Sequence, residues 1–131
     1  MCIIAFLLSN LGYDVWLGNI RGNTYSRAHV NYTVNDAEFW DFSWDDMAEH
    51  DLPATIDHIA NVTNQCGSIL YVGHSMGTTM FFALMSARPE YNKKIRAMFA
   101  LAPVASMTNV KSPIRLLAPW ANDIEVVYSY H

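Results

Sequence analysis

The sequence predicts an α/β fold in which parallel strands are joined by crossover helices. Three short apolar segments are expected to be strands, Tyr13–Leu17, Ser68–Val72 and Ala97–Leu101, and helical patterns separate them. Strands that alternate with helices favour a parallel sheet with right-handed crossovers. These segments lack polar alternation, as strands covered on both faces do. The 131 residues are 52% hydrophobic and only 15% charged, which is typical of a well-buried part of a fold.

Charge and hydropathy argue against nucleic-acid binding and against a membrane-spanning helix. The net charge of −4 provides no basic surface for nucleic acid, so we expect no such partner. No apolar run approaches the roughly 20 residues that are needed to span a bilayer. Residues 1–10 are apolar but lack the positive region and cleavage site of a signal peptide, so we interpret them as the end of a buried helix.

A long polar loop should connect the first strand to the next helix. Residues 18–41 are rich in Asn, Gly, Tyr and Arg, and a loop of this length is usually functional or held by packing.

Asn31 begins an Asn-Tyr-Thr tripeptide in this loop, and Asn61 begins an Asn-Val-Thr tripeptide near the end of a predicted helix. Both tripeptides are acceptor signatures for N-glycosylation.

Two helices are expected after the loop. Ser43 and Asp46 form a capping-box pattern that should begin the first. Pro53 should kink this helix, or Asp51 should restart a turn with Pro53 inside it. The second helix, Met76–Ala87, is apolar almost all round and should therefore be buried on most sides.

The strongest functional signal is Gly73-His74-Ser75-Met76-Gly77, which follows an apolar strand and opens a buried helix. This is the setting of the nucleophile in α/β-hydrolases. We predict that Ser75 is the nucleophile on a strained turn, that Gly73 and Gly77 prevent clashes there, and that the Met76 N–H is half of an oxyanion hole. His74 should point away from Ser75 and pack under this strand-to-helix turn, which is called the elbow (Gly73–Gly77). The alternative is a glycine-rich strand-to-helix turn whose serine has no catalytic role.

We predict no metal site and no cofactor. His50 and His58 lie eight residues apart near one helix, and no zinc motif fits them. Cys2 and Cys66 could pair in an oxidising compartment, but two free buried thiols are the favoured interpretation.

Six strings outside the elbow are specific enough to compare with known families: Gly12–Asn19, Arg21–Arg27, Phe39–Ser43, Asp51–Asp57, Ala102–Ala105 and Lys111–Pro113. Together with the elbow they resemble the acid lipase family, which includes gastric and lysosomal acid lipases. The resemblance covers nearly the whole chain. Family members often carry Gln where this chain has Met76, a position that contributes its backbone N–H.

The resemblance implies a partial α/β-hydrolase fold, with residues 1–105 in the central core and residues 106–131 at the start of a helical cap or lid. It implies N-glycosylation, secretion or lysosomal targeting, and hydrolysis of lipid esters, either acylglycerols or sterol esters, with lipid-interface contact through the cap. The family's His-Gly oxyanion loop lies upstream of this chain, and the triad Asp and His lie downstream. The isolated chain should then be inactive; the alternative is a non-catalytic lipid-binding or truncated product of the same fold.

The resemblance also predicts which strands pair. In this fold the central upstream strand lies between the two that resemble Tyr13–Leu17 and Ser68–Val72, and both it and the downstream strands are missing from the chain. Ser68–Val72 should therefore pair with Ala97–Leu101 on one side and have a gap on the other.

Overall fold

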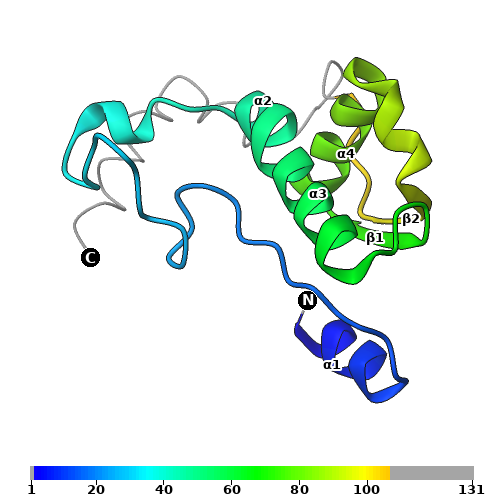
Figure 1. The fold of residues 1–131 in the computed structure, drawn as a ribbon. Coiled ribbons are helices and arrows are strands. Elements are labelled where there is room, and N and C mark those ends of the chain that lie inside the picture. The colour runs from blue at the N-terminus through cyan, green and yellow to red at the C-terminus, as the bar shows by residue number, and fades with distance from the viewer. Residues whose placement is uncertain (1, 107–131) are drawn as a thin grey trace.

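The computed structural model describes residues 2–106, in which helical segments precede and separate two strands (Figure 1). In order they are α1 (Cys2–Asn10), η1 (Ala37–Trp40), α2 (Trp44–Asp46), η2 (Met47–Asp51), α3 (Leu52–Thr63), β1 (Ile69–His74), α4 (Met76–Ala87), η3 (Pro89–Lys93) and β2 (Ile95–Leu101). The helix predicted over Met76–Ala87 has these bounds in the structure. Of the expected cap segment, residues 106–131, only Ser106 lies within the described residues.

The sheet of the described residues has two parallel strands, β1 and β2, connected through α4 and η3. Their register runs from Leu70 opposite Ala97 to His74 opposite Leu101, after an irregularity at Ile69. The predicted α/β class with parallel strands and crossover helices is confirmed. As predicted, the strand before the elbow pairs with Ala97–Leu101 on one side, and no other described segment pairs with it.

The prediction of a strand at Tyr13–Leu17 is wrong for the described structure. These residues have no regular secondary structure. Tyr13, Trp16 and Leu17 are all exposed. A strand exists only where a neighbour completes its hydrogen bonds, and an apolar pattern alone does not supply that neighbour.

The core lies between α4, the η2–α3 segment and one face of the sheet (Figure 1). Its buried members are Ala48, Leu52, Ile56, Met80, Phe81, Leu84 and Tyr91, and the strand residues Ile69, Tyr71, Ile95 and Met98 pack against them. The other face of the sheet is open among the described residues, where Leu70 is 40% and Phe99 is 53% exposed. The expectation of strands covered on both faces is therefore met on one face only.

The capping box at Ser43 is confirmed. The Ser43 Oγ accepts a hydrogen bond from the Asp45 N–H at 3.2 Å, and the Asp46 carboxylate accepts one from the Ser43 N–H at 2.8 Å. The chain then passes through the π-helical turn η2 into α3, with Pro53 in the first turn of α3. Pro53 therefore lies in a first helical turn, as one of the two expectations had it, where a proline costs no hydrogen bond. Asp51 does not restart the helix, because its backbone is helical, with φ −70° and ψ −45°, and its side chain makes no capping bond.

The N-terminal helix is present as predicted, but its expected burial is wrong. Helix α1 stands apart from the unit formed by α3, α4 and the sheet (Figure 1). Ile3, Phe6 and Leu7 are 76%, 69% and 58% exposed. The apolar sequence favours burial, but nothing among residues 2–106 packs over these side chains. No helix in this part of the chain is long and apolar enough to cross a membrane.

The long loop is held by packing, one of the two predicted explanations for its length. The Arg21 guanidinium donates to Asp51 Oδ1 from Nε at 2.8 Å and from Nη2 at 2.7 Å, and the Arg21 N–H donates to Asp51 Oδ2 at 2.9 Å. Gly22 has a φ of +77°, and a Cβ there would lie 2.6 Å from the Phe42 ring. The string Arg21–Arg27 therefore lies against two others that resemble acid lipases, Phe39–Ser43 and Asp51–Asp57, and ties this part of the loop to the helix.

Candidate active site

Ser75 occupies a strained turn between β1 and α4, as predicted. Its backbone has φ +50° and ψ −116°, a conformation that costs a non-glycine residue about 1–3 kcal/mol. The surroundings hold it there. The Ser75 N–H donates to the Leu101 carbonyl of β2 at 3.0 Å, and the Ser75 carbonyl accepts from the Thr78 N–H at 2.9 Å. Ser75 itself is exposed, so its hydroxyl is accessible.

The two glycines of the motif have different surroundings. A Cβ on Gly73 would lie 2.8 Å from Tyr71 Cε1 and 3.1 Å from the carbonyl carbon and oxygen of Gly77. The predicted close approach of strand and helix is therefore present at Gly73. At Gly77 the nearest atom to such a Cβ is the Tyr71 hydroxyl at 3.6 Å, which is an ordinary contact, so the expected clash is absent among the described residues.

Tyr71 stabilises the elbow from the core side of β1, a role that the sequence analysis did not predict. Its hydroxyl donates to the Gly77 carbonyl at 2.9 Å, and its ring stacks on Phe81 with centroids 4.7 Å apart. Burial raises the pKa of the Tyr71 hydroxyl, so it is a neutral donor at physiological pH. A tyrosine two residues before a Gly-x-Ser-x-Gly motif, on the inward-facing side of the strand, is a signal that could have identified it.

A second missed feature is a pair of threonines in the first turns of α4. Thr78 is fully buried, and its Oγ1 donates to the Ser75 carbonyl at 2.6 Å and accepts from the Val104 N–H at 2.9 Å. The Thr79 Oγ1 donates to the Val104 carbonyl at 2.7 Å. Two adjacent threonines in a helix that is apolar almost all round were the available signal, because a buried hydroxyl needs partners.

His74 and Met76 flank the nucleophile candidate, and both are exposed. The expectation that His74 packs under the elbow is wrong. Alternate side chains of a strand point to opposite faces, so His74 shares the open face with Leu70 while Gly73 is buried on the other. Met76 is the first residue of α4, where a backbone N–H has no acceptor within the helix. Its N–H is thus available to an oxyanion, as the oxyanion prediction requires.

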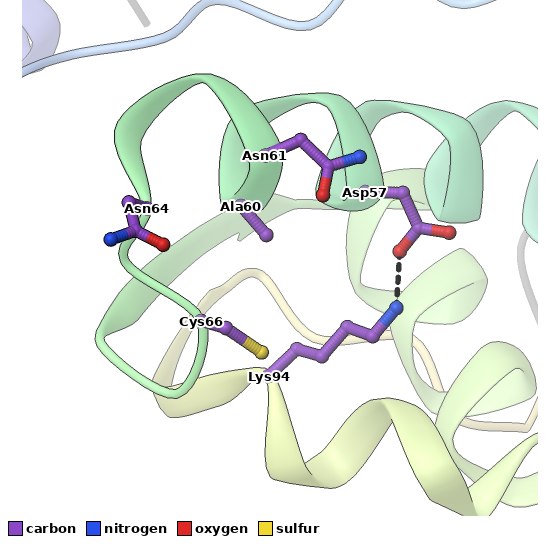
Figure 2. Close-up of a pocket in the computed structure, with 6 residues that line it drawn as sticks. All are labelled: Asp57, Ala60, Asn61, Asn64, Cys66 and Lys94. Atoms are coloured by element: carbon purple, nitrogen blue, oxygen red, sulfur yellow. Dashed lines mark hydrogen bonds and ion pairs between the residues drawn. The ribbon is translucent and has the colours of Figure 1, made fainter.

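One pocket among the described residues lies at the edge of the sheet opposite to Ser75. It has a volume of about 320 Å³ and is lined by Asp57, Ala60, Asn61, Asn64, Cys66 and Lys94 (Figure 2). Cys66 and Lys94 precede β1 and β2, whereas Ser75 follows the carboxyl end of β1. In open α/β sheets ligands bind beyond the carboxyl ends of the strands. The pocket is therefore not part of the elbow.

A polar network forms one wall of this pocket. Lys94 donates to Asp57 Oδ1 (Figure 2), and the Tyr91 hydroxyl donates to Asp57 Oδ2 at 2.8 Å. Partial burial opposes the ionisation of Asp57, but the hydrogen bonds from Lys94 and Tyr91 outweigh it and lower the pKa of the carboxyl.

Cys66 is a free, exposed thiol, so its predicted burial is wrong; the side chain of Cys2 lies outside the described residues. Among residues 2–106, no three His, Cys, Asp or Glu side chains gather as metal ligands would.

Residues 1–126 match the model of the α/β-hydrolase fold family, to which the chain therefore belongs. Within this family it is similar to acid lipases. It is 52% identical over 114 residues to lipase member K of Mus musculus, which is 87% of this chain and 28% of that protein. It is 52% identical over 115 residues to gastric triacylglycerol lipase of Mus musculus, or 88% and 29% of the two chains. It is 50% identical over 114 residues to human lysosomal acid lipase/cholesteryl ester hydrolase, or 87% and 28%.

These relatives confirm the resemblance to the acid lipase family. The chain spans less than a third of the length of the relatives that it matches.

Proposed function

We propose that this chain is the nucleophile-bearing segment of a serine-dependent carboxylic ester hydrolase, a lipase, with Ser75 as the nucleophile. One observation carries the proposal. Ser75 is held at φ +50° on a strand-to-helix turn with its side chain exposed, and such strain persists only where the surroundings maintain it. Acylglycerols or sterol esters are the proposed substrates, which the names of the triacylglycerol lipases and the cholesteryl ester hydrolase support.

In the proposed reaction the Ser75 hydroxyl attacks the ester carbonyl, and the Met76 N–H donates to the oxygen that becomes negative. A general base must take the serine proton during the attack. Among residues 2–106, no histidine is hydrogen bonded to the Ser75 hydroxyl, and His74 shares the open face of the strand with Leu70. We therefore propose that the triad Asp and His and the second oxyanion donor come from other segments of the fold, and that the 131 residues alone are inactive.

The proposed setting is the secretory pathway, with secretion or lysosomal delivery. The relatives are named as gastric and lysosomal enzymes, which supports this. Asn31 lies in an exposed part of the long loop and is the first proposed glycosylation site; Asn61 is exposed on α3 and is the second. Contact with a lipid interface is proposed for the cap region that residues 106–131 would begin.

A chimeric lipase tests the nucleophile assignment. Mouse gastric triacylglycerol lipase would carry the 115 matching residues of this chain in place of its own, and turnover of a p-nitrophenyl ester would be measured. Ser75→Ala should reduce kcat by at least about 10³-fold, because nothing else forms the acyl-enzyme. Ser68→Ala, in the turn just before β1, is the matched control and should retain activity. Equal kcat values for Ser75→Ala and the parent would refute the assignment.

The isolated chain gives an independent measurement. The 131 residues should label slowly with an organophosphonate probe, whereas the chimera should label rapidly at Ser75. Rapid stoichiometric labelling of the isolated chain would show that a residue of this chain already activates Ser75. A folded chimera that never labels would instead favour the alternative function, a non-catalytic lipid-binding product.

A further inference from the structure

We propose that Thr78 is a positioning residue for catalysis: its hydroxyl sets the direction of the Met76 N–H by holding the Ser75 carbonyl. The inference rests on the proposed function, because it concerns how the oxyanion donor of that reaction is aimed. Thr78 does not touch the reacting atoms. It acts through one peptide group, the one that joins Ser75 to Met76.

The hydrogen bonds of the Thr78 hydroxyl have an unambiguous direction. The Val104 N–H can only donate, and it points to Thr78 Oγ1 at 2.9 Å. The hydroxyl hydrogen is therefore free to lie on the bond to the Ser75 carbonyl, whose oxygen is 2.6 Å away. Thr78 is fully buried, so no water competes for either bond or replaces the hydroxyl when it is lost.

The Ser75 carbonyl and the Met76 N–H belong to the same planar, trans peptide group and point in opposite directions. Fixing the carbonyl therefore fixes the N–H. Thr78 donates to this oxygen twice, from its N–H at 2.9 Å and from its Oγ1 at 2.6 Å. A hydrogen bond to the carbonyl also polarises the peptide and strengthens its N–H as a donor. Thr78 thus influences both the aim and the strength of the proposed oxyanion contact.

The same hydroxyl connects the elbow to the loop that follows β2. The Ser75 N–H is held by Leu101, the chain turns at Ala102 with φ +48°, and Val104 then binds Thr78. The strained turn is therefore held at both of its backbone polar groups, at the N–H by β2 and at the carbonyl by Thr78. Without the Thr78 hydroxyl, rotation of the Ser75–Met76 peptide would relieve part of the strain at Ser75 and turn the Met76 N–H away.

Thr79 provides a matched control beside Thr78. The Thr79 Oγ1 binds the other polar group of Val104, the carbonyl, at 2.7 Å, but this hydroxyl makes no bond to Ser75. Thr79→Val and Thr78→Val each remove one hydroxyl and one bond to the same loop residue. Only Thr78→Val removes the bond to the peptide of the oxyanion donor, so a difference between the two variants isolates the positioning role.

The test compares these variants in the chimeric lipase. Thr78→Val should lower kcat about tenfold with KM unchanged, which is less than the 10²- to 10³-fold loss that follows removal of an oxyanion donor. Inhibition by a boronic acid, which mimics the tetrahedral intermediate, should weaken by a similar factor. Thr78→Ser, which keeps the hydroxyl, should restore kcat to within about threefold, and Thr79→Val should retain it.

Each outcome decides between this inference and a structural role. A folded Thr78→Val enzyme with unchanged kcat overturns the inference, as does an equal loss of kcat in both valine variants. If Thr78→Val does not fold, Thr78→Cys replaces it, because a thiol is a weak donor of similar size. A reduced kcat in Thr78→Cys supports the inference, and an unchanged one overturns it. Activity in Ser75→Ala would refute the proposed function instead, so the two failures are distinguishable.

Discussion

Replacing Gly73 and Gly77 by alanine, one at a time, should change the stability of the 131-residue chain in opposite directions. The two glycines belong to one motif, but the space around them differs. A Cβ on Gly73 would lie 2.8 Å from Tyr71 Cε1 and 3.1 Å from the Gly77 backbone. The Tyr71 ring cannot retreat freely, because its hydroxyl binds the Gly77 carbonyl and its face stacks on Phe81.

The expected magnitudes follow from these contacts. Overpacking costs about 1–3 kcal/mol, and the smaller conformational freedom of an unfolded chain with alanine offsets about 0.4–1 kcal/mol of it. Gly73→Ala should therefore reduce the free energy of unfolding by about 1–2 kcal/mol. Gly77 is helical, and the nearest atom to its Cβ would be 3.6 Å away. Gly77→Ala should raise the free energy of unfolding by about 0.5–1 kcal/mol, since alanine favours a helix over glycine.

Urea unfolding followed by far-ultraviolet circular dichroism measures both changes against the unsubstituted chain. The midpoint should fall for Gly73→Ala and rise for Gly77→Ala, with the denaturant slope unchanged in both. The reasoning is refuted if Gly77→Ala destabilises the chain as much as Gly73→Ala does. That result would mean that the motif requires glycine at Gly77 for a reason other than the space seen in the structure.

Three further predictions concern the core, acid stability and modification. Leu84→Ala should reduce the free energy of unfolding by about 2–5 kcal/mol, because this residue is only 1% exposed. Leu70→Ala, at a site that is 40% exposed, should change it by less than about 1 kcal/mol. Urea midpoints that fall equally in the two variants would contradict this. The pKa of Asp57 is lower in the folded chain than its unfolded value of about 4, so the ionised carboxyl stabilises the fold above about pH 4, and this stability is lost as the pH falls through the folded pKa. The free energy of unfolding of Asp57→Asn should therefore depend less steeply on pH in the acid range. Parallel plots of unfolding free energy against pH for the two chains would exclude this contribution. Chain secreted from eukaryotic cells should lose mass at Asn31, and to a lesser extent at Asn61, on glycosidase treatment, and an unchanged mass would count against both sites.

Several elements could be predicted because their determinants lie within a few residues of one another. The capping box depends on Ser43 and Asp46, which are three residues apart. The turn at Ser75 depends on a short apolar strand, on Gly73 and on the helix that follows directly. The hydrogen bonds of the capping box close locally, so the sequence pattern contains the groups that form them.

Features that depend on distant neighbours could not be predicted in the same way. Tyr13–Leu17 has the composition of a strand, but no described strand pairs with it. His74 was expected to be covered, yet the face of β1 that carries it is open among residues 2–106. Burial and pairing are properties of two surfaces, and a segment's own residues describe only one of them.

The sequence by itself determined the α/β class, the family and the residue at the elbow, because these depend on strings of adjacent residues. Only the tertiary structure decided what holds that elbow in place. Thr78 and Val104 are 26 residues apart, and their hydrogen bond exists because β2 returns the chain to the first turn of α4. A buried hydroxyl must find partners, but which backbone groups become those partners is set by how the strands pair and where the next loop turns.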